Sequence, residues 1–198
     1  MVMRRRPDAS VSSPLLSRLC ALSLATLLVT AGLVVGGCGE KTPTTASRGP
    51  IDACTVLTVA DVEKVLDVKV GDPQERTYGK GDFWASTCQY HGDAGNETRS
   101  AGILLKPHQD KQGAEKAYAA YEAELIAELG KGVALAPVEG IGQRAGWQDF
   151  GTSIGQLAVF QGPYQLIITA SATPNADQLT NAKTLARKAL GHLYYVLR

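Results

Sequence analysis

The chain has 198 residues with 20 basic and 19 acidic side chains, and 44% of its residues are hydrophobic. This length indicates one globular domain, less often two. If residues 1–37 are removed, four arginines and one aspartate leave with them, so 16 basic and 18 acidic residues remain and the net charge is −2. Such a balance excludes an electrostatic basis for binding DNA or RNA, and we expect no nucleic-acid partner.

Residues 1–37 have the pattern of a bacterial lipoprotein signal peptide. Residues 4–6 are arginines, and residues 19–35 are apolar or small apart from one serine and two threonines. Gly36 and Gly37 then leave room for an enzyme to reach the thiol of Cys38. We therefore predict that Cys38 is acylated and anchors the chain on the extracytoplasmic face of the cell membrane. An uncleaved membrane anchor is the alternative, although a span requires about 20 residues.

Residues 38–50 are polar and contain two prolines, so we interpret them as a lipidated flexible tether. Residues 51–198 then form the single folded domain. Cys20 leaves with the signal peptide and Cys38 carries lipid, so Cys54 and Cys88 remain as one pair in an oxidising compartment. We predict a structural disulfide between them. A redox pair is the alternative, but such pairs usually have Cys-x-x-Cys spacing, which is absent here.

The domain begins with a helix that Thr58 and Asp61 cap, ending near Asp67. A polar loop over 71–81 precedes strands over 85–91 and 100–106, and the clearest helix covers 110–129. Strands over 154–160 and 164–171 are joined by a hairpin turn at 161–163, and Asn175 or Asp177 opens the last helix. Hairpin-linked strands with N-terminal, central and C-terminal helices predict an α+β fold, an antiparallel sheet packed with helices.

The periodicity also predicts which side chains face the core. On the strand over 85–91, Cys88 and Tyr90 share one face and Gln89 lies on the other. Apolar positions that share a face elsewhere are Tyr164, Leu166, Ile168 and Ala170 on the last strand, Ala114, Ala117, Tyr118, Tyr121, Leu125 and Leu129 on the central helix, and Leu179, Ala182, Ala186, Leu190, Leu193 and Leu197 on the last helix.

Three short segments resemble a group of small, mainly actinobacterial envelope lipoproteins. They are Asp52-Ala53-Cys54-x-x-Leu57-Thr58-x-x-Asp61-Val62, Cys88-Gln89-Tyr90 and Gly140-Ile141-Gly142-Gln143-Arg144-Ala145. The resemblance covers about residues 51–197. It implies a two-cysteine α+β domain of unassigned function, similar to the photosystem-associated PsbP fold or the Mog1 fold, and it supplies no catalytic residues.

Two glycine-rich motifs suggest chemistry that their contexts do not support. Ser153 stands in a Gly-x-Ser-x-Gly sequence, with Asp177 and His192 following in the order of an α/β-hydrolase triad. A strand rather than a helix follows Ser153, so we interpret the motif as a turn and keep a serine hydrolase as the alternative. The sequence Gly140-Ile141-Gly142 opens no helix and is interpreted as a turn rather than a dinucleotide loop.

The remaining candidate residues are histidines and tryptophans. His91, His108 and His192 lack the spacing of metal ligands, so we predict no metal site and no cofactor. Trp84 and Trp147 lie near predicted loops. They either cap the ends of the core or, if exposed, form a surface that binds a partner.

These observations favour a lipid-anchored, non-enzymatic binding or accessory protein of the bacterial cell envelope. Its partner is expected to be an envelope protein, a glycan or a small apolar ligand that the domain carries. The alternatives are an extracytoplasmic serine hydrolase that uses Ser153 and a purely structural assembly factor.

Overall fold

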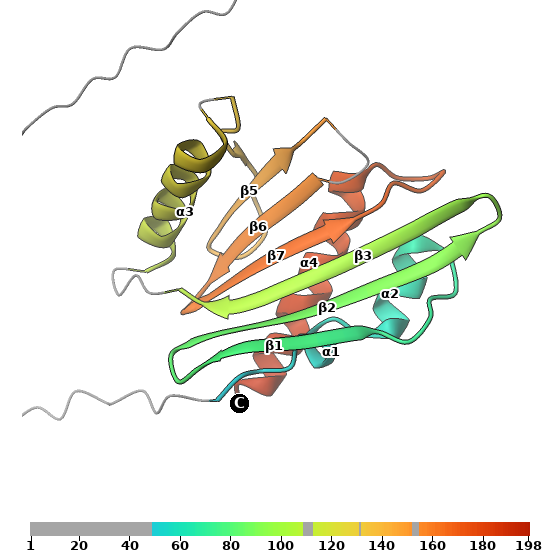
Figure 1. The fold of residues 1–198 in the computed structure, drawn as a ribbon, viewed down its shortest axis with the longest axis horizontal. Coiled ribbons are helices and arrows are strands. Elements are labelled where there is room, and N and C mark those ends of the chain that lie inside the picture. Colours follow the sequence, from blue (N-terminus) through green and yellow to red (C-terminus); the bar gives the residue numbers. More distant parts are fainter. Residues whose placement is uncertain (1–48, 109–112, 131, 152–154) are drawn as a thin grey trace, which may run out of the picture. The chain divides into compact units, whose positions relative to one another are not determined.

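The computed structural model describes residues 49–108, 113–130, 132–151 and 155–198 (Figure 1). The predicted signal peptide, the acylation site Cys38, nearly all of the predicted tether and Ser153 lie outside these described residues.

The described residues form a seven-stranded antiparallel sheet with the order β1-β2-β3-β7-β6-β5-β4. The strands are β1 (Gln74–Lys80), β2 (Phe83–Ala94), β3 (Glu97–Pro107), β4 (Ala136–Pro137), β5 (Arg144–Asp149), β6 (Gly155–Gln161) and β7 (Tyr164–Ala170). Helices α1 (Ala53–Val56), α2 (Val59–Leu66), α3 (Ala114–Leu129) and α4 (Gln178–Val196) pack on it. The α+β architecture predicted from the sequence is confirmed.

The helices divide between the two faces of the sheet. α4 packs on β6 and β7, and α1 and α2 pack on β3 and on α4. In β6, Leu157 and Val159 belong to the hydrophobic cluster that contains α4, whereas Ala158 and Phe160 belong to the cluster that contains α3. Because neighbouring residues of a strand point to opposite faces, α3 and α4 lie on opposite sides. Figure 1 shows α3 near β5 and β6, with no described helix in front of β1, β2 and β3.

Several local predictions are confirmed. Thr58 and Asp61 form the predicted capping box at the start of α2, and Asp177 caps α4 by accepting a hydrogen bond from the Thr180 N–H at 2.7 Å. β6 and β7 form the predicted hairpin. Cys88 and Tyr90 are fully buried while Gln89 is exposed, and the four predicted core positions of β7 are buried.

Other predictions are wrong. Residues 74–80, expected in a loop, form β1, all of whose residues are exposed. An edge strand without a buried side shows no hydrophobic alternation, so only its pairing with β2 defines it. α1 and β5 were not expected, and Leu129, expected at the end of the buried stripe of α3, is 54% exposed. Leu129 is the last residue of α3 and comes after Leu125, the last residue of that helix that is buried.

Candidate functional site

A line of polar side chains crosses the sheet on the face opposite α4. The strand registers pair Gln74 with Gln89, Gln89 with Gly102, Gly102 with Thr169, Thr169 with Gln156, and Gln156 with Gln148. Residues directly paired across antiparallel strands point to the same face. We call these six residues from six strands the amide row: Gln74, Gln89, Gly102, Thr169, Gln156 and Gln148.

The orientation of the amide row follows from its sequence neighbours. Cys88, Ile103, Leu157 and Ile168 each stand next to a member of the row, and all four belong to the cluster that contains α4. Since side chains alternate along a strand, the row must point away from α4. The predicted exposure of Gln89 is thus one part of a feature that spans the sheet.

Exposure differs along the amide row, and Gly102 in its middle is buried. Gln74 and Gln89 are exposed, Thr169 and Gln156 are half-buried, and Gln148 is only 2% exposed. Neither the amide nitrogen nor the amide oxygen of Gln148 has a hydrogen-bond partner among the described residues. A buried amide without partners costs about 1–3 kcal/mol. The row therefore ends in a side-chain amide that makes no hydrogen bond with the described residues.

Glycine at position 102 gives the Thr169 side chain room in the middle of the row. A Cβ atom placed on Gly102 would lie 2.9 Å from the hydroxyl oxygen of Thr169 and 3.8 Å from Cγ of Gln89. A larger residue would therefore crowd Thr169, whereas its distance to Gln89 would be an ordinary van der Waals contact. Gly102 itself is buried, so the backbone of β3 is not exposed at this point of the row.

An apolar line runs beside the amide row. Thr87 pairs with Leu104, Leu104 with Ile167, and Ile167 with Ala158. Leu104 and Ile167 are half-buried. Two exposed rings from the β1–β2 hairpin, Tyr78 and Phe83, lie on this same face, at 52% and 75% exposure. The face opposite α4 thus combines amides, aliphatic groups, aromatic rings and the basic side chains of Arg76, Lys80 and Lys106.

α3 borders this face through aromatic contacts. The rings of Tyr118 and Tyr121 lie 5.8 and 6.0 Å from that of Phe160, and the guanidinium of Arg144 lies 4.8 Å from the centre of the Tyr118 ring. Burial, reinforced by Glu122, raises the pKa of Tyr118, and burial followed by Glu124 raises the pKa of Tyr121. Both phenols therefore stay neutral hydrogen-bonding groups at physiological pH.

The two tryptophans do not lie in loops. Trp84 belongs to β2, is 4% exposed and stands 6.3 Å from the ring of Tyr164. Trp147 belongs to β5, is half-buried and packs so closely over Gly155 that no side chain would fit there. The interpretation of the two rings as an exposed pair that binds a partner is therefore wrong for Trp84, which fills the core. Trp147 is likewise mainly a packing residue.

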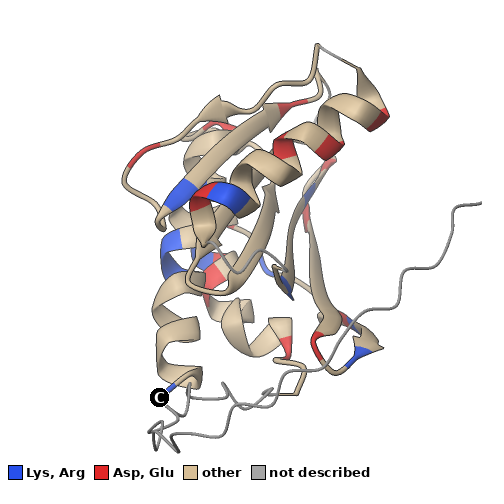
Figure 2. Cartoon of the chain, turned by 90° about the vertical axis from the view of Figure 1, so that its left-hand side faces the viewer, with Lys and Arg blue, Asp and Glu red and all other residues tan. Residues whose placement is uncertain are grey.

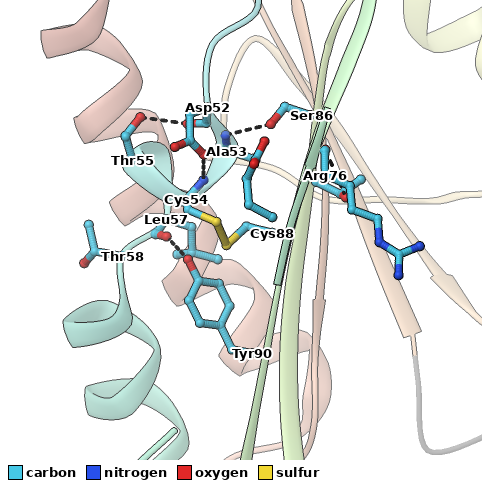
Figure 3. Close-up of a disulfide and its surroundings, with 12 residues drawn as sticks. Asp52, Ala53, Cys54, Thr55, Leu57, Thr58, Arg76, Ser86, Cys88 and Tyr90 are labelled. Atoms are coloured by element: carbon cyan, nitrogen blue, oxygen red, sulfur yellow. Dashed lines mark hydrogen bonds between the residues drawn. A yellow bond between two sulfur atoms is a disulfide. The ribbon is translucent and has the colours of Figure 1, made fainter. Parts of the chain in front are cut away.

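The predicted disulfide between Cys54 and Cys88 is present, with a Cα–Cα distance of 5.2 Å (Figure 3). It joins α1 to β2, and two hydrogen bonds also connect this part of the chain to β2. The Ala53 N–H donates to Ser86 Oγ at 2.9 Å, and the Tyr90 hydroxyl donates to the carbonyl of Leu57. Burial raises the pKa of the Tyr90 phenol far above its ordinary value. The disulfide is a structural link in this corner of the domain.

A charged cluster joins α2 to α4. The carboxylate of Asp61 accepts hydrogen bonds from Lys188 Nζ at 2.9 Å and from the Thr58 hydroxyl at 2.7 Å, and His192 Nδ1 lies 3.4 Å away. Burial raises the pKa of Asp61, but the bonds from Lys188 and Thr58 and the nearby positive charge together lower it below its ordinary value. The ionised form is thus the one that the fold stabilises.

The residues of the serine-hydrolase alternative are not assembled among the described residues. Asp177 is the N-cap of α4 and His192 lies fifteen positions further along it, which is about 22 Å at the rise of a helix. The carboxylate beside His192 is that of Asp61 instead. No parallel strands occur in the described sheet. Ser153 itself lies outside the described residues, so its role as a nucleophile stays a prediction of the alternative.

The three histidines lie apart from one another. His91 is exposed on β2, and Nε2 of His108 lies 2.7 Å from the carbonyl of Gly162, while His192 faces Asp61. The described part of the chain holds no group of three histidine, cysteine, aspartate or glutamate side chains placed to share a metal ion. Among the described helices, none combines the length and hydropathy that crossing a membrane requires.

Comparison with models of known protein families, with curated proteins and with solved structures finds no match to this chain. The similarity to the PsbP or Mog1 fold stays a prediction.

The amide row was missed by sequence reasoning for a physical reason. Each glutamine occupies an ordinary outward position on its own strand, and no local pattern links it to the others. Only the register of six strands brings them into one line. The alternation that marks Gln89 as outward facing was the one available signal, because it separates this amide from buried Cys88 and Tyr90.

Proposed function

We propose that this protein is a lipid-anchored, non-enzymatic binding protein of the bacterial cell envelope, and that the amide row is its binding surface for a glycan. The observation that carries the proposal is a line of polar side chains on the sheet face opposite α4. Gln74, Gln89, Thr169 and Gln156 are exposed or half-buried there, and the line ends in Gln148, a buried amide without a hydrogen-bond partner among the described residues. The leader sequence and the Cys54–Cys88 disulfide support a place outside the cytoplasm.

The chemistry of the row matches a chain of sugars. A glutamine amide offers two donors and an acceptor, so it can bond neighbouring hydroxyl groups or an acetamido group of a sugar. Leu104, Ile167 and the exposed rings of Tyr78 and Phe83 offer apolar surface to the C–H faces of the same sugars. The row itself consists of amides, a hydroxyl and a glycine, which suits a neutral or weakly charged glycan. Arg76, Lys80 and Lys106 lie on the same face outside the row and could bond further sugar oxygens.

The extended shape of the row favours an oligomer over a monosaccharide. Adjacent strands are about 4.8 Å apart, so the five spacings between six strands cover about 24 Å. A single sugar ring would contact two strands, whereas a chain of several sugars could engage all the exposed and half-buried members of the row, from Gln74 to Gln156. A small apolar ligand would leave the amides without partners, and this disfavours a carrier function for this face.

The proposal is tested by calorimetric titration of the chain with neutral oligosaccharides of glucose and of N-acetylglucosamine, from one to six units. Affinity should increase with length. Gln89→Ala and Gln156→Ala should each weaken binding about fivefold, the equivalent of about 1 kcal/mol for one hydrogen bond.

The matched control is Gln161→Ala, which removes an exposed amide outside the row and should leave affinity unchanged. Absence of binding to every oligosaccharide, or equal effects of all three substitutions, would contradict the proposal.

A further inference from the structure

The last two turns of α4 form an apolar groove with the β6–β7 turn. The groove has a volume of about 370 Å³ and its apolar lining comes from Pro163, Leu190, Leu193, Tyr194 and Leu197. We call it the α4 groove. It lies on the α4 side of the sheet, away from the amide row.

Exposed apolar residues surround the α4 groove. Tyr194, Tyr195 and Val196 are 56%, 72% and 43% exposed. Residues 189–197 contain no acidic or basic side chain apart from one histidine, and in Figure 2 this end of α4 carries no charge colour. The guanidinium of Arg198 lies 4.2 Å from the centre of the Tyr194 ring. Tyrosine with a neighbouring arginine is a combination suited to the boundary between water and lipid.

The chain enters the folded domain at this same end. Helix α1 packs on α4, and the Val56 carbonyl lies 3.1 Å from Nδ1 of His192, one residue after the groove residue Gly191. In Figure 1 the first described residues and the end of α4 lie at the same lower end of the domain. The β2–β3 turn is at the other end of the long β2 strand.

The length of the predicted tether limits the distance from this end to the membrane. Ten residues separate Cys38 from Gly49, and a flexible chain of that length has an end-to-end distance of about 17 Å. β2 has twelve residues, a span of about 36 Å at the rise of a strand. If Cys38 is acylated, a tether of this reach would allow the α4 groove to contact the lipid, whereas the β2–β3 turn lies at the far end of β2.

We propose that the α4 groove and the exposed residues Tyr194, Tyr195 and Val196 dock on the surface of the bilayer that holds the acyl chains of Cys38. This inference rests on the lipid anchor of the proposed function. The bilayer fits as the occupant because the apolar, uncharged end of the domain is the end that the tether keeps near it. Docking there leaves the amide row exposed to the envelope, on the opposite face of the sheet.

The test uses the full lipidated chain reconstituted into vesicles of phosphatidylcholine and phosphatidylglycerol. Tyr195→Trp places a reporter beside the groove, and Asn96→Trp places one at the exposed β2–β3 turn. Emission is compared between vesicles with ordinary lipids and with lipids brominated in the acyl chains, and the wild-type chain supplies the background of Trp84 and Trp147. Flotation of the protein together with the vesicles shows independently whether the chain is anchored in the lipid.

Docking predicts that the added emission of Tyr195→Trp falls about twofold in brominated vesicles, because docked side chains reach about 5–10 Å into the interface. The emission of Asn96→Trp should not change. Three outcomes would overturn docking and leave the anchor in place. The chain could float without quenching of Tyr195→Trp, or both reporters could be quenched equally. The third outcome is a concentration-dependent dimer that protects Tyr195→Trp. A chain that does not float would overturn the anchor, and docking with it.

Discussion

Removal of the Cys54–Cys88 disulfide should destabilise the domain by about 4 kcal/mol. The bond joins residues 34 apart in the sequence, and the chain-entropy relation gives about 3.8 kcal/mol for closing a loop of that length in the unfolded state. The double substitution Cys54→Ala and Cys88→Ala removes the bond without leaving a free thiol. The hydrogen bonds from Ala53 to Ser86 and from Tyr90 to Leu57 remain, so the variant should still fold.

The assay is equilibrium unfolding in urea, monitored by circular dichroism. The variant should unfold at a lower urea concentration with a similar or larger slope, since its unfolded state is less compact. Wild-type protein kept in reductant is the matched control and should behave like the variant. A loss below about 1 kcal/mol would refute the reasoning, because it would mean that the unfolded chain gains little freedom when the loop is opened.

Two further predictions concern the core and the charged cluster. Trp84→Ala should lower the free energy of unfolding by about 3–5 kcal/mol, because the ring is 4% exposed. Phe83→Ala removes a ring that is 75% exposed and should change the free energy of unfolding by less than about 0.5 kcal/mol. Equal losses for the two variants in urea unfolding would contradict the assigned burial. Asp61→Asn should cost about 1–2 kcal/mol at neutral pH by weakening the bond from Lys188. The pKa of Asp61 is lower in the folded protein than in the unfolded chain. The wild type should therefore be more stable than Asp61→Asn by the full amount above the ordinary aspartate pKa. This difference in stability should disappear as the pH falls through the lowered pKa of the folded protein. If the melting temperatures of the wild type and Asp61→Asn differ by a constant amount down to about pH 2, the stabilising role of the ionised carboxylate is contradicted.

Local signals predicted much of the fold. The capping pair Thr58 and Asp61, the cap Asp177 and the turn at 161–163 each act within a few residues, so the sequence shows them directly. The buried side of β7 follows from simple alternation, because that strand is central and has one face in the main core. The disulfide was predictable because the expected cleavage and acylation account for Cys20 and Cys38 and leave one pair of cysteines.

Features that depend on distant pairing were not predictable. β1 is polar and exposed throughout, so it exists through its bonds with β2 rather than through a pattern of its own. Trp84 was misplaced because its polar and glycine-rich surroundings are those of a hairpin, while its side chain points into the core. The amide row requires the register of six strands, which no window of the sequence contains.

The binding claim is tested most directly by nuclear magnetic resonance on isotope-labelled protein. The side-chain amide signals of Gln74, Gln89, Gln156 and Gln148 are followed while a neutral oligosaccharide is added, with Gln161 as the internal reference. Our account predicts saturable shifts in the signals of the accessible row members Gln74, Gln89 and Gln156, and none in Gln161. Shifts confined to residues outside the row, or no saturable shift in any glutamine signal, would contradict the assignment of this face as the glycan-binding surface.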